Sequence, residues 1–159
     1  MNILDFSNRR GTIVHLLPQV YALLKKEGVN LPNIIIWKHA MNKAVVEIHR
    51  KWVFALEGNK IVKGLLFYHL SSDGKSCYID SLVATDSKLA EALLKKFEQD
   101  DIVKERQAFY ISRHVKKEAS EEVLETVGLQ DESVFNEHGF QPLGGLADTV
   151  SALKVRYLR

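Results

Sequence analysis

Hydrophobic residues recur first with the spacing of helices. Apolar side chains at intervals of three or four residues predict a helix over 17–27, with Pro18 in its first turn and Gly28 as the residue that ends it. The first ten residues are polar and indicate no element. A second helix is expected to open at Pro32, a favoured place for proline. Its predicted apolar stripe consists of Trp37, Met41, Ala44, Val45 and Ile48.

The spacing then changes to that of strands. Three segments rich in β-branched and aromatic residues predict strands at 52–57, 61–70 and 76–83. The connections at 58–59 (Gly-Asn) and 71–75 (Ser-Ser-Asp-Gly-Lys) have the composition of hairpin turns, so an antiparallel meander is expected. Strict alternation in the third strand predicts two faces, Cys77, Ile79, Ser81 and Val83 on one and Tyr78, Asp80 and Leu82 on the other.

The third predicted strand turns at 84–86 and runs into an amphipathic helix that Asp86 or Ser87 can cap. A fourth strand is predicted over 107–112. Because a helix joins it to the third strand, it should lie parallel to that strand through a right-handed crossover. Later elements are short helices at about 120–128 and 132–138 and a hairpin of 140–146 with 150–158. The order predicts one α/β domain over residues 1–159 with a mixed sheet.

The junction between the third strand and its helix is a candidate anion site. A helix start offers unpaired N–H groups and the positive end of the macrodipole. Lys88 and the backbone N–H groups of 87–90 could hold a phosphate. Asp86 favours the alternative of an ordinary capped helix start, because its carboxylate already occupies the positive end. Both interpretations stay open.

Composition narrows the class of protein. The chain has 159 residues, 46% of them hydrophobic, which is enough for one core. A net charge of +2 indicates no strong attraction to nucleic acid or to a membrane surface. No apolar run approaches the roughly 20 residues of a membrane span. The lone Cys77, interpreted as a small buried apolar residue, allows no disulfide within the chain and suits a cytoplasmic location.

Several chemistries find no pattern in the sequence. The six histidines are scattered, and none forms a close pair with cysteine or histidine at metal-ligand spacing, so no metal site is expected. The chain also contains no phosphate-binding P-loop, no dinucleotide glycine motif and no G-x-S-x-G nucleophile turn.

Two segments and the order of elements match a known pattern. Residues 78–83 (YIDSLV) are similar to a hydrophobic central strand, and residues 134–140 (VFNEHGF) to a late helix end followed by phenylalanine. With two leading helices and a meander, the chain resembles the GNAT superfamily, the Gcn5-related N-acetyltransferases, from about residue 16 onward. A first strand of that family is not evident. The resemblance implies a GNAT-like fold that binds acyl-CoA at the strand–helix junction.

The resemblance also implies acetyl-CoA, or another acyl-CoA, as co-substrate. The family's pyrophosphate loop follows R/Q-x-x-G-x-G/A, and Thr85, Lys88 and Ala90 stand at its three defining positions. Only Ala90 matches, and Lys88 would supply a point charge where glycine is missing. The residues expected to bind the donor are Leu82, Val83, Ala84, Ser87, Lys88, Leu89 and Ala90.

Candidates for the general base lie mostly on the third strand. Asp80 and Tyr78 are predicted on one face, and a carboxylate there could take the amine proton directly or through water. His69 and His138 are further candidates by their chemistry alone. The competing interpretation for each is a polar residue with a structural partner.

The general acid is less evident. The resemblance implies a tyrosine at the position of Phe135, which has no proton to give. Tyr110 or Ser112 on the predicted fourth strand could replace it, although a tyrosine on a strand usually serves in packing.

These features predict an acyl-CoA-dependent N-acetyltransferase acting on a small-molecule or peptide amine. One alternative is a GNAT-fold binding or interaction module without activity, favoured by the missing glycines and by Phe135. Another is an acyltransferase with a donor other than CoA. An exposed sheet edge or the final hairpin could also pair with a second copy of the chain.

Overall fold

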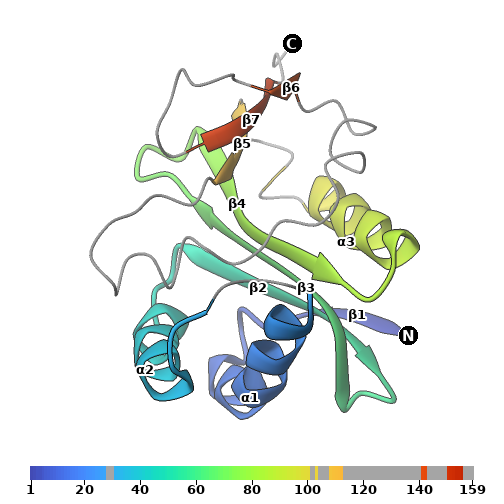
Figure 1. Ribbon diagram of the computed structural model, residues 1–159. Coiled ribbons are helices and arrows are strands. Elements are labelled where there is room, and N and C mark those ends of the chain that lie inside the picture. Colours follow the sequence, from blue (N-terminus) through green and yellow to red (C-terminus); the bar gives the residue numbers. More distant parts are fainter. Residues whose placement is uncertain (28–30, 101–102, 104–107, 113–140, 143–149, 156–159) are drawn as a thin grey trace.

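The computed structural model describes residues 1–27, 31–100, 103, 108–112, 141–142 and 150–155. The elements in these ranges are ordered along the chain as shown in Figure 1: β1 (Asn2–Asp5), α1 (Arg10–Lys26), α2 (Ile34–Val45), β2 (Arg50–Glu57), β3 (Ile61–Leu70), β4 (Ser76–Ala84), α3 (Ser87–Gln99), β5 (Ala108–Ser112), β6 (Gln141–Pro142) and β7 (Val150–Val155).

The strands form one sheet in the order β1-β2-β3-β4-β5-β7-β6. Strands β1 to β4 pair antiparallel, and β4 pairs parallel with β5, from Ser76 opposite Ala108 to Ile79 opposite Ile111. Strand β7 pairs antiparallel with both β5 and β6. The predicted meander, the parallel fourth strand of the prediction and the mixed sheet are therefore confirmed.

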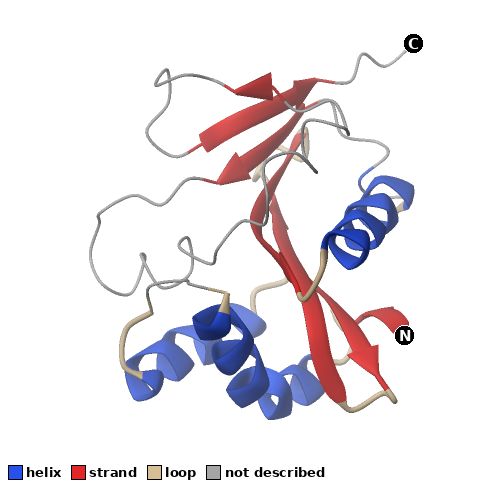
Figure 2. Cartoon of the chain, turned by 45° about the vertical axis from the view of Figure 1, so that its right-hand side comes forward, coloured by secondary structure: helices blue, strands red, loops and turns tan. Residues whose placement is uncertain are grey.

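Helices α1 and α2 pack on one face of the sheet and α3 on the other (Figure 2). The core on the α1–α2 side includes Ile13, Leu17, Leu24, Trp37, Phe54, Leu65, Phe67 and Val83. The core on the α3 side includes Val53, Leu66, Tyr68, Ile79, Leu82, Leu93 and Phe97. Helices thus flank the sheet on both faces.

The N-terminal segment differs from its prediction in two ways. Residues 2–5, expected to form no element, make β1, in which Leu4 pairs with Phe54 of β2. Helix α1 begins at Arg10, so Pro18 lies inside the helix and not in its first turn. Proline has no N–H, so Pro18 cannot donate the helical hydrogen bond to the carbonyl of Val14. Pro18 is exposed, and water can reach that carbonyl instead. Burial of the opposite side of α1 compensates for the lost hydrogen bond.

Helix α2 confirms most of its predicted stripe. Asn33 caps the helix, its side chain accepting a hydrogen bond from the N–H of Ile35 at 2.8 Å, and Pro32 lies just outside. The buried stripe residues are Trp37, Met41, Ala44 and Val45. Ile48 was wrongly assigned to the stripe, because the helix ends at Val45 and Ile48 is 82% exposed.

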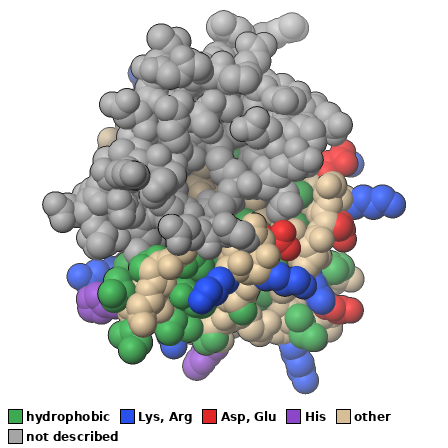
Figure 3. Space-filling model, viewed as in Figure 1, with side chains coloured by type: hydrophobic (Ala, Val, Ile, Leu, Met, Phe, Trp, Pro, Cys, Tyr) green, Lys and Arg blue, Asp and Glu red, His purple; other side chains and the backbone are tan. Residues whose placement is uncertain are grey.

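The start of α2 also carries exposed apolar side chains. Ile35 and Ile36 are exposed, and hydrophobic side chains gather with lysine and arginine over this part of the molecule (Figure 3).

Strand β4 departs from strict alternation at Asp80. Phe67 of β3 pairs with Ser81 and Tyr68 pairs with Ile79, which leaves Asp80 as the extra residue of a β-bulge. A bulge exchanges the two faces beyond it. Cys77 and Ile79 share a face, as predicted, but the assignment beyond Asp80 was wrong. Leu82 and Ala84 pack on the α3 side with Cys77 and Ile79, while Val83 packs on the α1–α2 side. Cys77 is fully buried, as interpreted.

Some predictions lie outside the described residues, namely the helices at 120–128 and 132–138 and the side chains of Phe135 and His138. The final hairpin is described in part, by β6 and β7. In the described ranges, no helix is both long and apolar enough to cross a membrane. The same ranges hold no group of three or more His, Cys, Asp or Glu side chains that could bind a metal ion.

Candidate functional site

Asp80 lies directly after the part of β4 that pairs with β5 in the described residues. Its residue is 3% exposed, and the bulge places it directly after Ile79, the last β4 residue that pairs with β5 in the described residues. Strand β4 continues to Ala84 alongside β3. A buried carboxylate therefore lies directly after the last described pair between β4 and β5.

His69 of β3 is the close partner of Asp80. Its Nδ1 lies 2.7 Å from Oδ2 of Asp80. An ionised carboxylate only accepts hydrogen bonds, so Nδ1 carries the hydrogen and Nε2 of the neutral ring keeps a lone pair. The Tyr78 ring stacks on the imidazole, with 5.0 Å between centroids and 9° between planes. Asp80 and Tyr78 thus both contact His69, and together they fix its orientation.

A second set of charged side chains comes from the turn before β2 and from the first residue of β2. Arg50 Nη1 lies 3.6 Å from Asp80 Oδ2, and Arg50 Nε lies 2.7 Å from Glu47 Oε2. Glu47 Oε2 is also 3.2 Å from Nε2 of His49, whose ring meets that of His69 edge to face at 6.1 Å. The guanidinium between the two carboxylates compensates the buried charge of Asp80.

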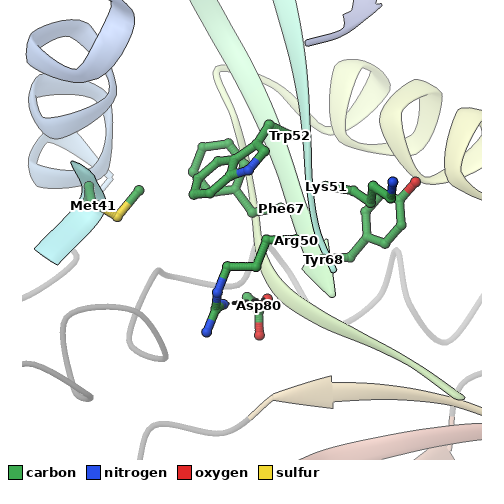
Figure 4. A pocket seen from close by; sticks show the side chains of 7 residues that line it. All are labelled: Met41, Arg50, Lys51, Trp52, Phe67, Tyr68 and Asp80. Atoms are coloured by element: carbon green, nitrogen blue, oxygen red, sulfur yellow. Dashed lines mark ion pairs between the residues drawn. The ribbon is translucent and has the colours of Figure 1, made fainter. Parts of the chain in front are cut away.

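Asp80 and His69 each line a pocket. Figure 4 shows the pocket beside Asp80, which is lined by Met41, Arg50, Lys51, Trp52, Phe67, Tyr68 and Asp80. His69 lines a neighbouring, more open pocket with Ile48, His49, Lys51, Leu70, Ser71, Ser72 and Gly74. The His69–Asp80 hydrogen bond therefore connects the two pockets.

Burial, with the charges of Asp100 and Asp5, raises the pKa of the Tyr68 phenol, so this group stays neutral.

At the junction between β4 and α3, backbone N–H groups of the first turn of the helix already donate hydrogen bonds to Asp86. Asp86 Oδ1 accepts the N–H of Leu89 at 2.8 Å, and the carbonyl of Asp86 accepts the N–H of Ala90 at 3.2 Å. Asp86 therefore caps α3, one of the two residues predicted to do so. Leu89 and Ala90 are buried, whereas Ser87 and Lys88 are exposed. A phosphate at this junction stays a prediction, with Lys88 as its nearest cation in sequence.

The other predicted residues are placed as follows. Leu82, Val83 and Ala84 are buried in the last part of β4. Tyr110 of β5 pairs with Tyr78 across the parallel ladder, and Ser112 pairs with Val150 of β7. The structure thus brings Asp80, Tyr78 and His69 together and places the expected donor-binding residues further along β4 and at the start of α3.

Sequence reasoning missed Glu47, His49 and Arg50. Arg50 pairs with His69 in the β2–β3 ladder, so the hairpin register was the signal that could have found it. A register shift between Ala55 and Leu56 moves the pairing of Arg50 by one residue. The turn at 58–59 alone would not have revealed this shift.

This order of strands and helices is the fold of the GNAT acetyltransferases. No protein-family model and no curated protein sequence matches the chain. Among solved structures, it resembles the aminoglycoside 6'-N-acetyltransferase from Enterococcus faecium, with a TM-score of 0.59 and 14% identity over 100% of this chain and 99% of that one.

Two further solved structures are similar. The PaiA N-acetyltransferase from Thermoplasma acidophilum, in complex with coenzyme A, gives a TM-score of 0.60 at 12% identity over 98% of this chain and 100% of that one. Gcn5 from Tetrahymena gives 0.59 at 14% identity, covering 96% of this chain and 94% of that one. The predicted GNAT-like fold is therefore confirmed.

Proposed function

We propose that this chain is an acyl-CoA-dependent N-acetyltransferase that acetylates an amine. The GNAT fold, shared over nearly the full length with three acetyltransferases, supports this class of reaction. The observation that carries the proposal is the Asp80–His69 pair. A buried carboxylate in the β4 bulge orients an imidazole whose other nitrogen can accept a proton.

In the proposed complex, acyl-CoA follows β4 beyond Ile79 and reaches the start of α3. Backbone groups of Leu82–Ala84 would contact the pantetheine arm, and Ser87 and Lys88, which are exposed, would meet the pyrophosphate. The sequence lacks the glycines that let a backbone approach phosphate closely. An ammonium group at Lys88 supplies charge in their place.

The proposed reaction is direct transfer. The amine nitrogen attacks the thioester carbonyl carbon, a C–N bond forms, and the C–S bond breaks to release CoA. His69 Nε2 takes the proton of the amine, and Asp80 stabilises the resulting imidazolium through Nδ1. Holding the two substrates together supplies much of the rate enhancement. Tyr110 or Ser112 of β5 remains the proposed donor of a proton to the departing sulfur.

The test begins with binding and then measures transfer. Acetyl-CoA should raise the melting temperature of the purified chain, and release of free CoA should be detected with a panel of primary amines. His69→Gln should lower kcat about 10²- to 10³-fold, the usual share of a general base. His15→Gln, at an exposed position on α1, is the matched control and should keep full activity. No melting shift at millimolar acetyl-CoA together with no transfer would overturn the proposal.

A second variant tests the donor site. Lys88→Glu should weaken acetyl-CoA binding several-fold, as expected for reversing one charge near a phosphate. Lys95→Glu, at another exposed position of α3, is the control for the change in net charge. Equal affinities of the two variants would move the donor site away from the α3 start.

The alternative is a binding module with the GNAT fold and no transfer activity. The observation that favours it is the Asp86 cap. The Asp86 carboxylate and carbonyl already accept the N–H groups of Leu89 and Ala90 at the helix start, and the carboxylate is negatively charged. Binding of acetyl-CoA without transfer to any amine would support this alternative. A donor other than CoA, a cytoplasmic location and pairing with a second copy of the chain also remain proposals.

A further inference from the structure

A buried indole N–H without an acceptor lies beside the candidate site. Trp52 is 3% exposed, and within the described part of the chain its Nε1 has no hydrogen-bond partner. The Trp52 ring packs edge to face on Phe67, with 4.7 Å between centroids, so it is held in place. Because an unpaired buried donor is costly, this N–H indicates an acceptor that is not part of the described protein.

The pocket next to this N–H holds groups of both hydrogen-bonding kinds. Trp52, Arg50 and Asp80 line the same small cavity, whose volume of about 10 Å³ is close to the space that one water molecule needs. In Figure 4 the indole nitrogen is on the edge of the ring that faces Arg50 and Asp80, and Met41 lies across the cavity. The side chains of Lys51 and Tyr68 lie on the other side of the strands in Figure 4. Two donors and one carboxylate therefore remain beside apolar side chains.

The chemistry of these three groups restricts the occupant. An ammonium has no lone pair for the indole N–H and is repelled by the Arg50 guanidinium. A carboxylate could accept from both donors, yet Asp80 repels it. A hydroxyl oxygen can accept from Trp52 and Arg50 and donate its own hydrogen to Asp80. It is the simplest group that satisfies all three.

We propose that Trp52 Nε1, Arg50 and Asp80 form a binding site for a single hydroxyl oxygen. That oxygen belongs either to a bound water or to a hydroxyl group of the amine substrate. Binding of the oxygen does not depend on acetyl transfer, whereas its assignment to the substrate rests on the proposed function. In the substrate case Trp52 selects amino alcohols over plain alkyl amines.

Crystal structures of three proteins test the site itself. In the wild type, an oxygen should lie about 3 Å from Trp52 Nε1. Trp52→Phe removes the N–H and keeps an aromatic ring, and that oxygen should be lost or displaced. The control is Trp37→Phe, since Trp37 Nε1 is also buried without a described partner but packs on Tyr21 and does not line this cavity. The oxygen should remain in the control.

Transfer assays with two probe amines identify the source of the oxygen. If the substrate supplies it, 2-aminoethanol should exceed propylamine in kcat/KM by about tenfold, near the strength of one hydrogen bond. The preference should vanish in Trp52→Phe and persist in Trp37→Phe. If water supplies it, the two amines should react equally and the crystallographic water should persist with either amine bound.

Two results would distinguish a failure of the oxygen-binding site from a failure of the proposed acetyl transfer. Wild-type crystals with no oxygen near Trp52 Nε1, and no effect of Trp52→Phe on the amine preference, would overturn the site. An oxygen held by Trp52 in a protein that transfers no acetyl group would support the site and remove the proposed function.

Discussion

At the β4 bulge, Asp80 contacts His69 and Arg50, which come from β3 and from the start of β2. At the junction with α3, Asp86 instead caps the helix that follows it directly. Both are aspartates of one β-strand–helix unit, yet Asp80 is 3% exposed and Asp86 lies at the surface. Asp80 is held by residues that are distant in the sequence, and Asp86 is held by its neighbours in the sequence.

This difference bears on where chemistry can occur. The bulge gathers a buried carboxylate, an oriented imidazole and a guanidinium between two adjoining pockets. The junction has already committed the N–H groups of Leu89 and Ala90 to Asp86. The bulge is therefore the better candidate for proton transfer, and the junction at most contributes to binding the donor.

The largest expected effect is at the bulge. Asp80→Asn removes the charge that orients His69 and stabilises its protonated form, so kcat for acetyl transfer should fall about 10²- to 10³-fold. Asp73→Asn, in the exposed turn before β4, is the matched control and should retain activity. Circular dichroism should show both variants folded. Equal activities of the two variants would mean that the bulge carboxylate has no part in the reaction.

The next largest effect concerns the packing of β3 against α3 near the junction. Gly64 of β3 lies so close to α3 that an added Cβ would be 3.0 Å from Leu93 Cδ1 and 3.2 Å from Leu89 Cδ2. Gly64→Val should therefore lower the free energy of unfolding by about 1–3 kcal/mol, measured by urea denaturation. Gly11→Ala, where nothing lies within 4 Å in helix α1, should instead stabilise by about 0.5–1 kcal/mol.

A smaller effect is expected from Arg10, which supports the bulge from a distance. Its guanidinium donates to the carbonyls of Val45, Glu47 and Arg50 at 2.7, 3.0 and 3.1 Å, and so holds the turn that presents Glu47 and Arg50. Arg10→Met should lower the free energy of unfolding by about 1–2 kcal/mol. The neighbouring change Arg9→Met, at an exposed position, should have little effect, and similar losses would contradict this role of Arg10.

The smallest effect should appear at the junction. Asp86→Asn keeps a side chain that caps helices well but removes the negative charge at the helix start. Stability should change little, while acetyl-CoA should bind about two- to fivefold more tightly by calorimetry. Glu91→Gln, on the exposed side of α3, controls for net charge. Unchanged affinity in Asp86→Asn alone would place the donor elsewhere.

The features that the sequence alone determined depend on residues close together in the chain. Gly58 and Asn59 both adopt a φ of 59°, the conformation of the predicted hairpin turn, and β3 has the predicted bounds Ile61–Leu70. The Asp86 cap is local in the same way. The parallel pairing of β4 with β5 was predicted from the order of elements, because a helix joins the two strands. Turn chemistry, capping and the length of a crossover act over a few residues or follow from the order of elements.

The candidate site depended on the tertiary structure. The bulge at Asp80 and the register shift near Leu56 decide that His69 meets Asp80 and that Arg50 lies beside both. Likewise, β1 forms only because β2 offers an edge, and Pro18 is tolerated inside α1 because the opposite side of that helix is buried. Register and packing depend on both faces of the whole sheet, so the sequence could nominate Asp80 and His69 separately but not as a pair.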